Sequence, residues 1–417
     1  MVPHLITALT GPINELEQRI LESMPAIERW FRLEWMEHTP VFYSAVGLRN
    51  AGFKLAPLST RLHPGGFNQL SEAMLPLAVQ AAMAAIEKIC PEAKNLLLIP
   101  DPKQRSADEL ASLATLVRIF HQAGLNVRLG ALEEGLGAPV ELALADGGSL
   151  LLEPLLRRRG RLLLKDFDPC TILLNCDLAD GVPQILKHLD EQYLLPPLHA
   201  SAAQRQPGSH LVTYEEVAKR FAKLLGMDPW LINPLHARCE APSFQAGAGL
   251  DELQTQADAI LAKVRKKYKD YGINEKPFLV LKPAGRQGAP GHQVVRDAKE
   301  LAGLYGPGPA ALLIQEGVPT LERLDAAAVE PVVYLLDRYV VGGSCWVLSE
   351  AGAAARQVPL AFADAAQLAR PGERPGASAP NRFYMYGVVA RLAMLAASYE
   401  LEQSDPEREE LEAALPV

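Results

Sequence analysis

The chain has 417 residues, of which 49% are hydrophobic and 22% are charged, and its formal net charge is −8. This length and composition predict a globular protein with a sizeable core, built as one large domain or as two to three ordinary ones. The moderate negative charge, without a long basic block, argues against nucleic acid as a partner.

The N-terminal stretch MVPHLITALTG lacks the basic start of a secretory signal, and no stretch is long and apolar enough to cross a membrane. The five cysteines are scattered singly, without a C-x-x-C pair. Such a distribution is typical of reduced cytosolic thiols rather than of a disulfide framework. We therefore expect a cytoplasmic protein without a membrane partner.

Helix and strand patterns alternate through the first half of the chain. Residues 69–90 and 110–123 are Ala- and Leu-rich runs with helical spacing. Three short buried runs are typical of strands: residues 94–100, 126–129 and 170–175. This alternation predicts an open parallel sheet covered by helices, which we expect to form an N-terminal α/β domain over residues 1–195.

The segment 40–70 combines short apolar runs, glycine turns and polar side chains. Its candidate substrate-binding residues are Arg49, Asn50, Lys54, Arg61 and Asn68. Arginine and lysine pair with carboxylates, and glycine allows close approach, so this segment is suited to a small carboxylate substrate. An ordinary turn region with solvated charges is the alternative, and the residues alone leave both open.

Residues 196–272 indicate a helical and linker segment. Its first part, up to residue 210, is rich in Pro, Ala, Ser and Gln and predicts a mobile loop. A long, charged, amphipathic helix is expected over 250–271 and ends at Gly272, a residue that commonly terminates helices.

The most informative stretch begins with the apolar run at 278–281, which predicts a buried strand. It leads into Lys282 and a loop with Gly285, Gly288 and Gly291. Glycines let backbone N–H groups approach phosphate oxygens and lysine adds a positive charge, so the pattern suits a nucleoside triphosphate. The spacing matches neither the P-loop nor the dinucleotide motif, and a plain surface turn is the alternative.

Two further strand patterns follow this loop. Gln315, Glu316 and Val318 lie where the first one ends, and they are suited to hold the edge of an adenine. Asp337 and Arg338 then open the second. This order resembles the ATP-grasp fold, in which two α+β lobes close on ATP and acidic residues on a late hairpin hold magnesium.

We therefore predict an α/β protein in which an N-terminal open sheet layer precedes an ATP-grasp-like part. The latter is expected over residues 273–417 and includes a final helix at 382–401.

Long strings of residues carry a more specific resemblance. In chain order they include IERWFR, LRNAGFKLAP, HPGGFNQL, NLLLIP, ILLNCDL, DPWLINP, EPVVYLLDRYVVGG and NRFYMYGVVARLA. On these strings the chain resembles the proteobacterial, ATP-grasp-like type of glutamate–cysteine ligase over nearly its whole length.

In that family Mg·ATP phosphorylates the side-chain carboxylate of glutamate, and the cysteine amine then attacks the acyl phosphate. The resemblance therefore implies ATP and Mg²⁺ as cofactors and amino acids as substrates. It makes Lys282 and Arg338 the catalytic candidates and Asp337 the metal ligand. The loop glycines and the residues around Glu316 are placed at the nucleotide, and the polar residues of segment 40–70 near the amino-acid substrate.

Several runs depart from the family pattern. Gly47 stands where the family has an acid, and the run that ends at Arg61 has lost a second one. Pro283 and Pro290 remove amide donors from the glycine loop. The run Glu350–Gln357 replaces one that is expected to supply metal ligands.

These departures keep two alternatives open. One is a ligase for a different carboxylate and amine. The other is a catalytically degenerate paralogue that binds a ligand, forms a homo-oligomer or pairs with an active copy.

Overall fold

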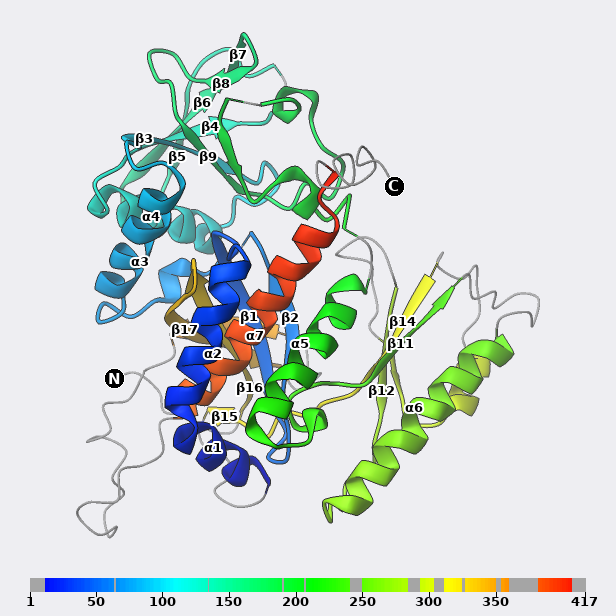
Figure 1. The fold of residues 1–417 in the computed structure, drawn as a ribbon. Helices are drawn as coiled ribbons and strands as arrows, with labels where there is room; N and C mark the ends of the chain where they lie inside the picture. Colours follow the sequence, from blue (N-terminus) through cyan, green and yellow to red (C-terminus); the bar gives the residue numbers. More distant parts are fainter. Residues whose placement is uncertain are drawn as a thin grey trace, which may run out of the picture.

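The computed structural model describes residues 12–63, 65–133, 135–189, 191–205, 208–240, 250–283, 293–303, 311–324, 327–349, 354–359 and 382–406. Within these ranges the chain forms seven α-helices (Figure 1). They are α1 (Pro12–Glu22), α2 (Met24–Glu37), α3 (Leu75–Ile89), α4 (Ala107–Gln122), α5 (Ser209–Leu225), α6 (Leu250–Asp270) and α7 (Arg382–Gln403). In the described part of the chain, no helix is long and apolar enough to span a lipid bilayer.

The strands of the same ranges form four sheets. They are β1 (Tyr43–Asn50), β2 (Leu55–Arg61), β3 (Asn95–Pro100), β4 (Asn126–Ala131), β5 (Val140–Ala143), β6 (Ser149–Pro154), β7 (Leu156–Arg158), β8 (Arg161–Leu163), β9 (Thr171–Asn175), β10 (Tyr193–Leu195), β11 (His236–Glu240), β12 (Leu279–Pro283), β13 (Gln293–Val295), β14 (Ala311–Glu316), β15 (Arg323–Leu324), β16 (Ala327–Leu336), β17 (Tyr339–Leu348) and β18 (Ala354–Pro359).

The predicted open sheet layer is confirmed. Its strand order is β10-β9-β3-β4-β6-β5, and all neighbours are parallel except β5 at the edge. The apolar run of β3 is buried on both faces, as expected for a central strand of a parallel sheet. α4 begins with a reciprocal capping box between Ser106 and Glu109, which satisfies free N–H groups of its first turn.

A second, antiparallel sheet occupies the middle of the molecule (Figure 1). Its order is β18-β17-β16-β1-β2, with β15 paired to β16. Helix α7 covers one face, where Val46, Leu48 and Val333 belong to the same core cluster as its buried residues. The segment before α3 approaches the other face, since a Cβ atom on Gly342 would lie 3.5 Å from Met74.

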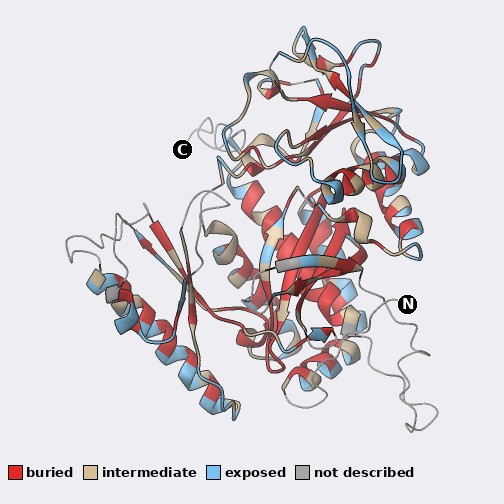
Figure 2. Ribbon diagram, turned by 180° about the vertical axis from the view of Figure 1, so that it is seen from behind, coloured by how far each residue is buried: buried red, intermediate tan, exposed pale blue. Residues whose placement is uncertain are grey.

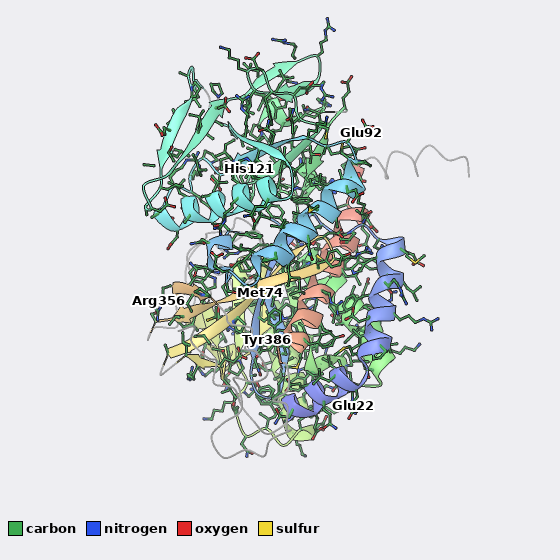
Figure 3. All side chains as sticks on the ribbon, turned by 90° about the vertical axis from the view of Figure 1, so that its left-hand side faces the viewer. Glu22, Met74, Glu92, His121, Arg356 and Tyr386 are labelled. Carbon is green, nitrogen blue, oxygen red and sulfur yellow. The ribbon has the colours of Figure 1, made fainter. Side chains whose placement is uncertain are left out.

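Figure 3 labels one residue at each face, Met74 beside α3 and Tyr386 on α7. Helix α7 is apolar around most of its circumference, and its residues from Val388 to Ala397 other than Arg391 are almost fully buried. A helix with this composition is stable only when packed on all sides. α1, α2 and α5 supply that packing together with the sheet.

A third sheet has the order β11-β14-β12-β13, and α6 packs on it. Figure 2 shows α6 with buried residues on one side and exposed ones on the other. Its buried stripe is Leu253, Ala257, Ile260, Leu261 and Val264. This spacing of three and four residues is the pattern that predicted the helix.

The chain is divided differently from the prediction. The hairpin β1–β2 pairs with β16 near the C-terminus, so residues 43–61 belong to the middle sheet and not to a domain ending at 195. In the same way β11, from the predicted linker segment, pairs with β14. Both sheets are therefore built from distant parts of the sequence.

Candidate functional site

Lys282 lies where the third sheet approaches the middle sheet. Its Nζ donates a hydrogen bond to Oε1 of Gln315 on the neighbouring β14, at 2.8 Å. Burial lowers the pKa of Lys282 to about 8, and the positive charge of Arg49 adds to this effect while Glu330 opposes it. Arg49 and Glu330 belong to β1 and β16, so charged groups from both sheets meet here.

Arg49 connects three segments at this place. Its Nε donates to Oε1 of Glu330 at 2.7 Å, and its Nη2 lies 2.5 Å from the same oxygen. Its Nη1 donates to the carbonyl oxygen of Val318, which follows β14, at 3.1 Å. The register of β1 and β16 brings the first pair together, because Gly47 opposes Val332 and the next side chains on that face are Arg49 and Glu330.

The same face of the middle sheet continues onto β2. Gly47 pairs with Ser59, and Ala45 pairs with Arg61. Ser59 and Arg61 are both exposed. A Cβ atom added to Gly47 would lie 2.9 Å from Ser59 Oγ, so the two strands meet here through small groups.

The side chain of Glu316 points to the opposite side of β14 from Gln315, as alternation along a strand requires. It is buried and accepts hydrogen bonds from Lys54 Nζ at 2.6 Å, Trp230 Nε1 at 3.0 Å and the backbone N–H of Leu235 at 2.9 Å. Its own N–H donates to the carbonyl of Leu235. Glu316 thus fixes the end of β14 from behind the site.

Two of the predicted substrate residues, Asn50 and Lys54, are buried and have protein partners, and their contact with substrate stays a prediction. Lys54 is 0% exposed and is paired with Glu316. Asn50 is 1% exposed, and its Nδ2 donates to Glu322 and to the hydroxyl of Tyr386 on α7. Both side chains face the core, so neither reaches a ligand on the Arg49 face.

Asp337 and Arg338 lie away from Lys282, and their predicted roles at the metal ion and the nucleotide stay predictions. They form the turn after β16, at the far end from Glu330, which at about 3.3 Å per residue is roughly 20 Å away. Asp337 is buried there. Its backbone N–H donates a hydrogen bond to the carbonyl oxygen of Phe42, and its carboxylate lies 3.8 Å from Nζ of Lys88 on α3. Arg338 is exposed and contacts Tyr339.

The other predicted site residues differ in how the structure places them. Gly285, Gly288 and Gly291 lie outside the described residues. Asn68 is half-buried in a short 3-10 turn after β2, and its role as a substrate contact stays a prediction. Lys282, Gln315, Val318 and Arg49 meet as described, and Arg61 shares the Arg49 face.

Sequence reasoning gave no site role to Glu330 or Trp230. Glu330 stands in a run of apolar residues that predicts burial, and its partner is far away in the sequence. Trp230 lies in the string DPWLINP, and nothing in that string indicates its hydrogen bond to Glu316.

A cavity of about 1050 Å³ opens elsewhere, lined by residues 39–42, by residues from 182–204 and by the end of α7 with the two residues 405 and 406. None of the predicted site residues lines it. It is therefore separate from the place where Lys282, Arg49 and Glu330 meet.

Comparisons with known proteins agree with this architecture. Residues 17–401 match the model of the GshA glutamate–cysteine ligase family. The crystal structure of a protein assigned as a gamma-glutamylcysteine synthetase from Methylobacillus flagellatus KT is 43% identical. The match covers 97% of this chain and 100% of that one, with a TM-score of 0.88.

A glutathione synthetase-like effector from Globodera pallida matches at 13% identity over 82% of each chain. Its TM-score of 0.38 is too low to bear on function. The comparison with curated proteins gave no match. The family-model match over residues 17–401 and the 43% identity to the Methylobacillus flagellatus protein establish that the chain belongs to the GshA glutamate–cysteine ligase family.

Proposed function

We propose that the chain is an ATP-dependent ligase of the glutamate–cysteine type, with the phosphates of the nucleotide held between β12 and the Arg49–Glu330 end of the middle sheet. One observation carries the proposal. A half-buried lysine with a neutral hydrogen-bond partner, Gln315, lies beside Arg49 at the junction of two sheets. A largely desolvated cation without a carboxylate partner of its own is suited to bind an anion.

The residues present support a positioning role in phosphoryl transfer. ATP, when bound, supplies the phosphoryl group that activates the glutamate carboxylate. Lys282 offers a compact positive charge, and Arg49 offers a planar set of donors that matches phosphate geometry. Positioning and charge stabilisation provide most of the acceleration in such reactions.

The Mg²⁺ that the family implies does not fit this donor set. Magnesium prefers octahedral oxygen ligands, mostly carboxylates, phosphates and water. The carboxylate of Glu330 already accepts a hydrogen bond from Arg49, and the carboxylate of Asp337 is at the other end of β16. Among the described residues, no three His, Cys, Asp or Glu side chains gather as a metal site.

A second candidate follows from the same observation. A family member that binds nucleotide or substrate without turning it over would keep Lys282 and Arg49 and dispense with metal ligands. Binding without release of ADP in the presence of glutamate and cysteine would favour this candidate over an active ligase.

The experiment is ATP titration by calorimetry, with ADP release measured in parallel. We expect Lys282→Ala to weaken ATP binding at least about tenfold, because a charge-assisted hydrogen bond contributes about 1.5–3 kcal/mol. Lys276→Ala is the matched control, since Lys276 precedes β12 and is exposed. Equal binding by wild type and Lys282→Ala would overturn the proposed site.

The same titration has a pH signature. Because the pKa of Lys282 is about 8, the lysine loses its charge as pH rises through that value, and ATP affinity should fall. In Lys282→Arg the affinity for ATP should stay constant between pH 7 and 9, since arginine keeps its positive charge over this range. A pH slope that survives in Lys282→Arg would point to another group.

A further inference from the structure

We infer that this chain holds the phosphates of its nucleotide with side-chain cations on one face of the middle sheet, in place of a divalent metal ion. The residues of this face that carry the inference are Gly47, Arg49, Ser59, Arg61 and Glu330, and Lys282 approaches it from β12. The inference rests on the proposed function and concerns how the ligand charge is neutralised.

The strand register places these residues on one face. Asn50 points to Tyr386 of α7, so its neighbour Arg49 points to the side of the sheet away from α7. Gly47 shares that side with Arg49, and its partner across the strands is Ser59. Arg61, two residues beyond Ser59 on β2, projects on the same side.

Carboxylates are scarce on this face. Among the residues that the register of β1, β2, β16 and β17 puts there, Glu330 alone is acidic. Its Oε1 already accepts from Arg49 at 2.5 and 2.7 Å. Glu322, the other buried acid nearby, binds Asn50 on the α7 side. Among the described residues of this face, a divalent cation would therefore find one carboxylate, and that one is already paired with Arg49.

The pair Gly47–Ser59 adds a steric reason. A Cβ atom at Gly47 would meet Ser59 Oγ at 2.9 Å, so the two positions cannot both carry long side chains without movement of the strands. This stretch of the face between Arg49 and Arg61 therefore lacks any side chain longer than a hydroxymethyl group. Phosphate oxygens can approach the sheet there more closely than at its flanks.

The charge balance favours an anion. Arg49, Arg61 and Lys282 are opposed by Glu330 alone among the described residues of this face. Arg61 is exposed and forms no ion pair with any described residue. Its charge acts on Tyr334, the side chain that follows Val332 on this face of β16. Two planar guanidinium groups and one ammonium group are chemically suited to a polyphosphate.

The test is calorimetric titration of the full chain with ATP at constant ionic strength, in EDTA and in excess Mg²⁺. We expect the affinity in EDTA to equal or exceed that in Mg²⁺. Arg61→Ala should weaken binding in EDTA by about tenfold, as loss of a charge-assisted phosphate contact does. Arg118→Ala on α4, an exposed arginine outside the site, is the control.

In a second variant, Mg²⁺ should have the opposite effect on ATP affinity. Ser59→Asp combined with Arg61→Asn puts two oxygen ligands two residues apart on this face of β2 and removes one cation, so Mg²⁺ should strengthen ATP binding in this variant and not in wild type. Wild-type binding that requires Mg²⁺ would overturn the inference and leave the proposed function intact. An absence of ATP binding in both EDTA and Mg²⁺ would overturn the proposed function itself.

Discussion

Lys54 and Glu316 form a fully buried ion pair directly behind the candidate site. The ammonium group also lies 4.2 Å from the ring centre of Trp230, and Trp230 donates to the same carboxylate. Burial lowers the pKa of Lys54 to about 8, although the charge of Glu316 opposes the shift. Since Gln315 precedes Glu316 on β14, this pair fixes the strand that positions Gln315 against Lys282.

Removing one partner of the Lys54–Glu316 pair should therefore destabilise the folded protein. We expect Lys54→Met to lower the free energy of unfolding by about 3–5 kcal/mol, because it leaves a carboxylate buried without its cation. The double variant with Glu316→Gln should recover most of the loss, since no unpaired charge remains. Urea denaturation followed by circular dichroism measures both. A single variant as stable as wild type would show that water or a proton compensates Glu316.

At the scale of the elements, α7 is held by polar contacts as well as by its apolar surface. Near its C-terminal end Glu400 is buried and accepts hydrogen bonds from Arg205 and from Ser209 at the start of α5. Burial acts to raise the pKa of Glu400, but the contacts with His210 and Arg205 outweigh it and lower the pKa to about 2. The contact joins α7 to α5 and to the segment before it.

This shift predicts a pH-dependent stability. The pKa is depressed in the folded state, so the stabilisation is complete above about pH 4.5 and is lost as pH falls through about 2. Glu400→Gln should cost about 3 kcal/mol at pH 7, and the difference from wild type should shrink in acid. The exposed Glu72→Gln is the control, for which at most a few tenths of a kcal/mol are expected. A loss that stays constant down to pH 2 would contradict the assignment.

Elements with a single strong pattern could be predicted from the sequence, and β3, β9 and α7 are examples. The hairpin β1–β2 could not, and it was interpreted as a loop-rich segment. β1 is central and buried on both faces, so it lacks the alternation that marks a strand, and Gly47 interrupts it. β2 contains Pro57, which suggests a turn but is tolerated because β2 is an edge strand beside a bulge.

The candidate site depends on the whole molecule. Arg49 and Glu330 are 281 residues apart, and no local pattern links them. The interpretation of Asp337 as the metal ligand relied on an acid at the end of a strand. Sequence does not tell which end of β16 faces the third sheet, and the structure shows that it is the end with Glu330.

The middle sheet should behave as one cooperative unit despite its origin in both ends of the chain. We expect the amides of paired residues such as Val46 and Val333 to exchange with the same free energy of opening, since neither strand is stable without the other. The strands of the open sheet layer, β3, β4 and β9, should form a separate group. Native-state hydrogen exchange in increasing urea measures this. Exchange of β1 together with β3 instead would contradict the division described above.

The pairing of β1 with β16 also bears on how the protein is made. When Arg49 of β1 has been synthesised, another 281 residues must be added before its partner Glu330 of β16. At about 5–20 residues per second this takes roughly 15–60 seconds. The open sheet layer between them has all its strands within residues 95–195 and can close during that interval. The edge of β1 that pairs with β16 stays uncovered until β16 has been made, so we expect this hairpin to need protection by a chaperone in the nascent chain.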